Sequence, residues 1–444
     1  MLTDLLRRLS HDHHVPGAQL AIYHNGEAAS AWVGEEEQDS GRAIAVNSRI
    51  PVGSIGKMFL AAIAMILVAD DDLALAEPVG HFLDELTGPA ARLAGTITLR
   101  QLLSHTSGLP SGLDDEQETP GSVRRYLAER ADRIALVCAP GAGFSYSNLG
   151  YLLVARIIEE ITGLSWNEAV ESLLLNPLGI EPSYVVAPSQ WQPRSPTASG
   201  HAVNPVTGVA RPIDQTLTAA LAPAGALAMS AEDLVAFARL HLHADRVPGV
   251  PLDLASVQEM HRAVPGAIPF GLADGWGLGM AVFRDGNHCS WVGHDGTADG
   301  TSCHLRIDPA GGRIVALTTN ADTGIELWQD LLDELRSSYF PVATYTPKSS
   351  TNRPVPLSAG FFGRYVNGDT EYAVSVREDG CPYVAVAGEI YPDLTLYDRG
   401  EFSVRHPESG RPIAAGRFLS HPSTGRVSGL QTGGRIARRL ESVS

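Results

Sequence analysis

The chain has 444 residues, of which 44% are hydrophobic and 19% are charged, and its formal net charge is -17 at pH 7. This length suits one large domain with a smaller second domain, and the composition is that of a folded globular protein. The negative charge argues against nucleic acid and anionic membranes as partners, because such partners need clustered lysine and arginine.

The first residues of the chain, MLTDLLRRLSHDHHVPG, lack the apolar core of a signal peptide and predict an amphipathic helix. We therefore expect a cytoplasmic protein. The most apolar stretch, residues 58–69, is too short to cross a bilayer and predicts a buried helix. The cysteines follow no metal-ligand spacing, which predicts reduced thiols, although a structural disulfide is compatible with the pattern. They are Cys138, Cys289, Cys303 and Cys381. We expect no metal and no other cofactor.

The order of the sequence patterns predicts an α+β domain. Residues 17–33 alternate apolar and polar side chains around Asn25-Gly26, which predicts a β-hairpin. Helical periodicity follows, and strand patterns return after Gly275 before a last helix. The helices are expected at 57–69, 99–103, 149–162 and 325–337, and the late strands at 276–283, 289–296, 302–308 and 312–320. Strands at both ends around a helical middle imply one antiparallel sheet closed by distant segments.

A second domain is predicted after residues 341–357, a stretch rich in Pro, Ser and Thr without apolar periodicity. We expect a first domain over 1–340, this linker, and a small antiparallel β-barrel over 358–444, where short strand-like runs recur. Three arginines near the end suit either a solvated strand end or a site for a carboxylate or phosphate. They are Arg435, Arg438 and Arg439.

The segment PVGSIGK, residues 51–57, precedes the apolar helix and holds a candidate nucleophile. Ser54 and Lys57 lie three positions apart, which on a helix puts both side chains on one face. A buried lysine can lose its proton near neutral pH, and the free amine can then activate a serine hydroxyl. A helix-start serine and a surface lysine would give the same spacing. The helix beyond Lys57 is nearly free of charge, which favours the catalytic pair.

Two further segments carry polar groups next to regular structure. The turn GFSYSNLGY, residues 143–151, enters an apolar helix, and extended backbone would point Tyr146 and Asn148 into a common space. An asparagine that caps the helix would give the same pattern. The segment GHDGT, residues 293–297, is a small-residue strand edge along which a substrate backbone can pair. His294 alone would equally suit a structural role.

Together the three segments stand in the order Ser-x-x-Lys, Tyr-x-Asn and His-x-Gly. This set resembles the penicillin-recognising serine enzymes, and its Tyr-x-Asn form is similar to class C β-lactamases, esterases of that fold and D-aminopeptidases. The stretches LLSHTSGL at 102–109 and NPLG at 176–179 resemble further segments of the group. The resemblance covers residues 10–338 and implies a serine β-lactamase/transpeptidase-like domain, an antiparallel sheet with helices. The region after the linker resembles the lipocalin-like β-barrel of some peptidases and thioesterases in the group.

The resemblance implies roles for individual residues. Ser54 would attack the substrate carbonyl carbon, and Lys57 and Tyr146 would relay its proton. Asn148 would hold the substrate amide and the lysine. The backbone N–H groups of Ser54 and Thr297 would form the oxyanion hole.

The late strand departs from the Lys-Thr-Gly form of many relatives. This chain has His294, Asp295 and Gly296 there, a form that resembles D-aminopeptidases. We expect His294 to act in catalysis by orienting the acyl chain, and Asp295 and Gly296 to bind substrate together with Asn148. A fixed cation for the carboxylate of a β-lactam is missing or titratable at this position, which argues against ordinary β-lactamase action.

The resemblance implies an acyl-serine enzyme, most similar to the penicillin-binding-protein-type thioesterases that release and cyclise nonribosomal peptides with a C-terminal D-residue. We expect a peptide substrate, which a carrier protein would deliver as a thioester. A hydrolytic D-aminopeptidase, a D-specific carboxypeptidase or an esterase would form the same acyl-serine and is the alternative. A non-catalytic ligand-binding relative is a third hypothesis, against which the intact set of Ser54, Lys57, Tyr146 and Asn148 argues.

Overall fold

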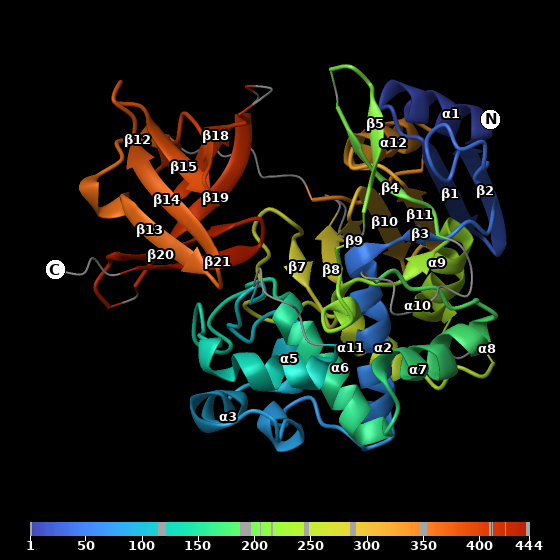
Figure 1. Cartoon of the computed structure of the whole chain (residues 1–444), viewed down its shortest axis with the longest axis horizontal. Helices are drawn as coiled ribbons and strands as arrows, with labels where there is room; N and C mark the ends of the chain where they lie inside the picture. Colours follow the sequence, from blue (N-terminus) through green and yellow to red (C-terminus); the bar gives the residue numbers. More distant parts are fainter. Residues whose placement is uncertain are drawn as a thin grey trace.

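The computed structural model (Figure 1) describes residues 2–113, 121–186, 197–204, 206–214, 216–243, 248–284, 290–338, 340–345, 353–407, 410, 412–421 and 423–440. Two bodies lie side by side. The part before residue 345 combines helices with antiparallel sheets, and the part from residue 353 onward is a curled antiparallel half-barrel of ten strands. The predicted α+β domain with a small β-domain behind it is therefore confirmed.

The main sheet has seven strands in the order β2-β1-β11-β10-β9-β8-β7. Their bounds are β1 (Gly17–His24), β2 (Glu27–Gly34), β7 (Gly275–Trp276), β8 (Ala281–Arg284), β9 (Ser290–Ala298), β10 (Thr301–Asp308) and β11 (Arg313–Thr319). The predicted hairpin is confirmed, with positive φ at Asn25 and Gly26 in its turn. β1 pairs with β11 in the register Ala18↔Thr319. Segments from the two ends of this domain thus close the sheet, as predicted.

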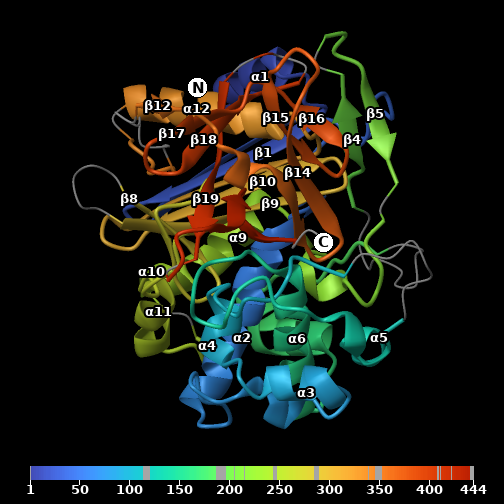
Figure 2. The same cartoon turned by 90° about the vertical axis from the view of Figure 1, so that its left-hand side faces the viewer.

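Helices cover both faces of the sheet (Figure 2). On one face Leu20 and Leu317 pack into the cluster that includes α1 and α12, while their neighbours Ala21 and Ala316 face the larger helical region. The helices are α1 (Leu2–Asp12), α2 (Gly56–Ala69), α3 (Gly88–Ala94), α4 (Leu99–Leu103), α5 (Val123–Arg130), α6 (Asn148–Thr162), α7 (Trp166–Val170), α8 (Asn176–Leu178), α9 (Ala231–Ala238), α10 (Leu240–His243), α11 (Leu254–His261) and α12 (Gly324–Ser337). Two strand pairs complete this part: β3 (Ile50–Pro51) with β6 (Ala228–Met229), and β4 (Gly200–Val203) with β5 (Ala210–Ile213).

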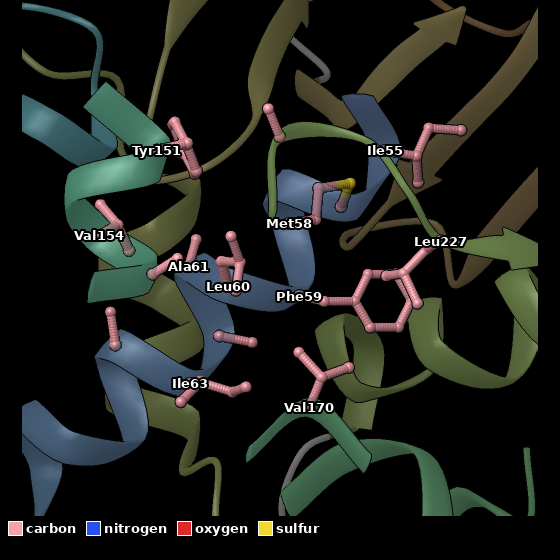
Figure 3. Packing of buried hydrophobic residues seen from close by; sticks show 14 of the residues in the cluster. Ile55, Met58, Phe59, Leu60, Ala61, Ile63, Tyr151, Val154, Val170 and Leu227 are labelled. Carbon is pink, nitrogen blue, oxygen red and sulfur yellow. The ribbon is translucent and has the colours of Figure 1, made fainter. Parts of the chain in front are cut away.

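α2 is the central helix of this part. Of its 14 residues, 12 are buried, so the helix has no free face. Figure 3 shows Phe59 beside Leu227, and Leu60 and Ala61 beside Val154 of α6. A helix packed on all sides cannot shift without opening the core. The start of α2 is therefore a rigid base for the segment that contains Ser54.

The predicted helices are confirmed within one residue at each end, and Gly163 ends α6 in the left-handed conformation. The single strand expected at 276–283 is wrong, because β7 and β8 are separate there. A Cβ at Gly277 would lie 2.0 Å from Met260 O, and one at Gly279 would lie 2.2 Å from Ala61 Cβ. The chain leaves the sheet between the two strands to pack against α11 and α2.

The half-barrel has the strand order β12-β17-β18-β19-β20-β21-β13-β14-β15-β16 and its own apolar core around Tyr365, Phe402 and Leu430. Its strands are β12 (Pro354–Val355), β13 (Gly363–Asn367), β14 (Thr370–Val376), β15 (Pro382–Val386), β16 (Glu389–Tyr391), β17 (Thr395–Tyr397), β18 (Glu401–Arg405), β19 (Pro412–Ser420), β20 (Val427–Thr432) and β21 (Arg435–Arg439). Part of the predicted linker, residues 346–352, lies outside the described residues, and β12 occupies its end.

Three of the four cysteines, Cys138, Cys303 and Cys381, are free thiols. Cys289 lies outside the described residues. Across the described part of the chain, each helix falls short of the length and apolar character that crossing a bilayer requires.

Candidate active site

Ser54 and Lys57 meet at the start of α2. Ser54 lies in the 3-10 turn η1 (Gly53–Ile55), which leads directly into the helix. Lys57 Nζ donates hydrogen bonds to Ser54 Oγ at 2.9 Å and to Ala224 O at 2.6 Å. Burial, together with the nearby charge of Arg435, lowers the pKa of Lys57 to about 7. The pair therefore has the geometry and the proton affinity of a hydroxyl beside its base.

Tyr146 lies close to the lysine amine. Lys57 Nζ is 5.4 Å from the centroid of the Tyr146 ring, and the ring of His105 stacks on that of Tyr146 at 4.2 Å between centroids. Burial raises the pKa of Tyr146 to about 12, an effect that the neighbouring Ser54 opposes. Within the described residues the phenol oxygen is buried and has no hydrogen-bond partner. Tyr146 is thus a neutral, buried hydroxyl next to the Ser54–Lys57 pair.

Two glycines bring β9 against the turn at Ser54. A Cβ at Gly53 would lie 2.2 Å from Thr297 O, and one at Gly296 would lie 2.0 Å from Val52 O and 3.0 Å from Ser54 N. Gly53 also has a φ of +52°, which side chains disfavour. Only glycine therefore permits this approach, which puts the backbones of Ser54 and Thr297 in one pocket wall.

His294 is buried and neutral. Its Nδ1 lies 2.5 Å from Asp295 O, and since a carbonyl only accepts, Nδ1 carries the proton and Nε2 is an acceptor. In the described structure Nε2 has no hydrogen-bond partner. Burial, and then the charge of Lys57, lowers the pKa of His294 to about 4. A neutral ring offers no cation to a substrate carboxylate, so His294 does not itself replace the charge of the lysine in Lys-Thr-Gly relatives.

The carboxylate of Asp295 links β9 to β10. Arg306 donates to both of its oxygens, at 2.7 and 2.9 Å, and His304 Nδ1 lies 2.7 Å from Oδ1. Although burial opposes ionisation, Arg306 and His304 hold the pKa of the Asp295 carboxyl well below its usual range. Asp295 lines the pocket, with its carboxylate already engaged in a bidentate ion pair.

Ser54 lies where two pockets meet. The first, of about 200 Å³, is lined by Ser54, Tyr146, Leu272, Trp276, Ala281, Phe283, His294, Asp295, Thr297 and Arg435. The second, of about 180 Å³, is lined by Pro51, Ser54, Asn148, Val185, Thr216, Leu217, Ala224, Gly225, Thr297, Ala298 and Asp299. Ser54 and Thr297 belong to both. The first pocket is mainly aromatic and apolar, and the second is more polar.

Tyr146 lines the first pocket and Asn148 the second, and the two pockets meet at Ser54. The alternation of side chains holds only in continuous extended backbone, and Asn148 is already the first residue of α6. The alternative, that Asn148 caps this helix, is wrong. Ser147 is the cap, and its Oγ accepts from Gly150 N at 2.9 Å. The amide of Asn148 is therefore not used for capping.

Arg435 comes from the half-barrel and lines the first pocket. Its guanidinium lies 5.3 Å from the centroid of the Tyr146 ring, and Nε donates to Ser111 Oγ at 3.0 Å. Of the two interpretations of the terminal arginines, the solvated strand end is wrong for Arg435. The sequence could not place it, because Ser111 and Arg435 are 324 positions apart. Arg438 is exposed.

The candidate catalytic and substrate-binding side chains thus lie around Ser54: Lys57 is hydrogen-bonded to it, and Tyr146, Asn148, His294, Asp295 and Thr297 line the pockets that it shares. The family model for β-lactamases matches residues 2–338. The chain belongs to the β-lactamase family. This is a family of serine hydrolases, so the protein is an enzyme of that class, and the resemblance to the penicillin-recognising serine enzymes is confirmed.

Individual relatives extend the comparison. Penicillin-binding protein 4 of Amycolatopsis lactamdurans is 32% identical over 330 residues, which cover 73% of this chain and 86% of the relative. The crystal structure of SurE is 36% identical, covers 99% of this chain and 98% of its own, and superposes with a TM-score of 0.87. A crystal structure of SurE with D-Leu superposes with a TM-score of 0.84. The likeness to SurE therefore includes the half-barrel.

A more distant likeness concerns the first part of the chain. The D-amino acid amidase of Ochrobactrum anthropi SV3, complexed with D-phenylalanine, is 23% identical and covers 76% of this chain and 99% of its own, with a TM-score of 0.63. At this identity the likeness shows the fold alone.

Proposed function

We propose that the protein is a thioesterase of the penicillin-binding-protein type. It accepts a peptidyl thioester or ester with a D-residue at its C-terminus, forms an acyl-Ser54 intermediate, and releases the peptide as a head-to-tail macrocycle. The observation that carries the proposal is the position of Ser54 at the junction of two pockets, because acyl chain and incoming amine each need a site beside the ester.

In the acylation step Ser54 Oγ attacks the carbonyl carbon of the donor. Lys57 Nζ, 2.9 Å from Oγ, takes the hydroxyl proton. The backbone N–H groups of Ser54 and Thr297 stabilise the oxyanion. The bond from the carbonyl carbon to the leaving sulfur or oxygen then breaks, and the leaving group takes the proton back from the Lys57–Tyr146 pair.

In the release step the N-terminal amine of the same peptide attacks the acyl carbon. Lys57 takes a proton from this amine, either directly or through Tyr146, whose phenol gives its own proton to Lys57 as it accepts the new one. The bond from carbon to Ser54 Oγ then breaks, and Oγ takes the proton from Lys57. Water at about 55 M competes, but an amine held next to the ester reaches effective molarities of roughly 10⁵ M or more. His294 lines the first pocket and its Nε2 is a buried acceptor without a partner in the described structure, which suits the task of orienting the acyl chain.

Two findings support the substrate class. SurE, which matches nearly the whole chain, has a crystal structure with D-Leu. The first pocket has an apolar wall of Leu272, Trp276 and Phe283, which suits the side chain of a hydrophobic residue at the acyl end. The indole Nε1 of Trp276 is buried without a partner in the described structure and would donate to a peptide carbonyl.

The test is a pair of synthetic peptidyl thioesters that differ only in the configuration of the C-terminal residue. We expect the D-form to be released mainly as the macrocycle and the L-form to react slowly, as read by mass. Ser54→Ala should form no acyl-enzyme with either peptide while keeping its melting temperature, because one hydroxyl contributes little packing. Linear acid from both epimers would contradict the cyclase and leave a D-specific hydrolase, and turnover by Ser54→Ala would contradict the covalent mechanism.

A further inference from the structure

The half-barrel holds the segment that contains Tyr146. The backbone N–H of Tyr146 donates to Gly434 O at 2.9 Å, in the turn between β20 and β21. On the next strand, Ile436 N donates to Ser145 Oγ at 3.2 Å. Gly434 N in turn donates to Phe270 O at 2.9 Å. The β20–β21 hairpin is thus bonded to the residue beside the lysine amine.

Asn367, on β13 of the half-barrel, joins the same segment to Asn148. Its side chain is 1% exposed, its Oδ1 accepts from Ser111 N at 2.7 Å, and its Nδ2 donates to Ile436 O at 2.8 Å and Ser145 Oγ at 3.4 Å. The carbonyl of Ser111 accepts the N–H groups of Asn148 and Leu149 at 2.8 and 3.0 Å. A short path of hydrogen bonds therefore runs from Asn367 through Ser111 to Asn148.

Gln431, on β20, is the second buried amide at this contact, also 1% exposed. Its Nε2 donates to Phe144 O at 2.9 Å and Ile268 O at 3.2 Å, and its Oε1 accepts from Arg417 Nε at 2.8 Å. Phe144 is two residues before Tyr146. Gln431 therefore fixes the backbone that leads into the Tyr146 segment.

Glycines at two turns of the half-barrel permit this close contact. Gly368 has a φ of +58°, and a Cβ there would lie 2.4 Å from Gly112 O. Gly434 has a φ of +70°, and a Cβ there would lie 2.4 Å from Leu272 Cδ1. Leu272 lines the first pocket, so the half-barrel turn lies directly behind the pocket wall.

We propose that Asn367 and Gln431 are positioning residues for acyl transfer, so that the half-barrel completes the active site. Buried amides are costly unless each polar atom meets its partner, so these contacts select one arrangement of Phe144, Ser145 and Tyr146. An apolar interface alone would permit small shifts. The proposal rests on the roles of Ser54 and Tyr146 stated above.

The experiment uses the full chain and a small fluorophosphonate that labels Ser54. Gln431→Met and Asn367→Leu keep the side-chain volumes and remove the hydrogen bonds. We expect the maximal labelling rate to fall between about tenfold and a hundredfold, because small displacements of reacting groups cost that much. The concentration for half-maximal labelling should change little, since the probe does not touch these residues.

Leu430→Ala is the matched control, because Leu430 is fully buried on β20 inside the core of the half-barrel. It should lower the melting temperature and leave the labelling rate unchanged. Should either amide variant fail to fold, Ser145→Ala is a smaller change that removes the hydrogen bonds from Asn367 Nδ2 and Ile436 N to this segment, and it should also slow labelling.

The outcomes separate the two proposals. The positioning role would be overturned if the amide variants and Ser145→Ala labelled at the wild-type rate. It would also be overturned if Leu430→Ala slowed labelling as much as the amide variants did. A wild-type protein that the probe does not label at all would instead contradict the proposed role of Ser54.

Discussion

Lys57 shows how burial converts an ordinary side chain into a base. In water its amine would be protonated throughout the neutral range. In the protein Nζ is fully buried, and its two acceptors are neutral, Ser54 Oγ and Ala224 O. The nearby charge comes from Arg435 and has the same sign. Both effects disfavour the charged form, so the free amine is available where a lysine normally is not.

This predicts the pH dependence of acylation and its response to Arg435. Because the pKa of Lys57 is lowered to about 7, the labelling rate of Ser54 should rise through pH 7 and level off above it. Arg435→Met removes a repelling charge, so the pKa of Lys57 should rise and the rising limb should move to higher pH. Rates are measured from pH 5 to 9.

Arg438→Met is the control for that shift, since Arg438 is exposed on the same strand. Its profile should coincide with that of the wild type. A flat wild-type profile would contradict the assignment of Lys57 as the base. An unshifted profile for Arg435→Met would show that the charge of Arg435 does not change the pKa of Lys57.

At the scale of elements, the site depends on the contact between η1 and β9. Gly296→Ala would put a Cβ 2.0 Å from Val52 O and 3.0 Å from Ser54 N, so β9 must move away from the turn. The two N–H groups of the proposed oxyanion hole would then separate. We expect the labelling rate to fall by about a hundredfold or more, the typical cost of one lost oxyanion donor.

Gly121→Ala is the control for this change, because a Cβ at Gly121 would meet no atom of the described structure within 4 Å, apart from its chain neighbours. It should label like the wild type. If Gly296→Ala also labelled at the wild-type rate, the strand would not contribute to the oxyanion site.

The elements that the sequence predicted correctly are those with local signals. The Asn25-Gly26 turn defines its hairpin, and the apolar run after Lys57 defines α2. Where the prediction was wrong, a distant contact decided the structure. Gly277 and Gly279 break a strand pattern because Met260 and Ala61 lie against them.

The same holds for the site. The spacing of Ser54 and Lys57 predicted a pair that one helical turn can form by itself, and the structure has it at 2.9 Å. No pattern in the neighbouring sequence predicts the ion pair of Asp295 with Arg306 or the position of Arg435 in the first pocket. Both depend on strand pairing and domain contact, which the order of residues along the chain does not reveal.

For the whole molecule the question is what the half-barrel does. The sequence predicted a small β-barrel behind a linker, and a tethered domain with its own core would be a natural wall for a long peptide. The half-barrel does have a separate core, around Tyr365 and Leu430. Its Arg435 also lines the first pocket, and its Gly434 O accepts a hydrogen bond from the backbone N–H of Tyr146. A wall would affect the reaction of long substrates only, whereas a positioning element would affect small and long substrates alike.

A chain that ends at residue 345 tests which of the two applies. We expect it to fold, because among the described residues the cores of the first part include none from the half-barrel. Circular dichroism would measure the melting transition of this chain. It should nevertheless label with a small fluorophosphonate at least about tenfold more slowly than the full chain, since the Tyr146 segment loses the bonds that hold it. A mere wall would matter only for a long peptidyl substrate. The opposite result is a shortened chain that labels with the small probe at the full rate and loses activity only on the long substrate. That result would show that the half-barrel is a wall, and it would contradict its part in positioning Tyr146.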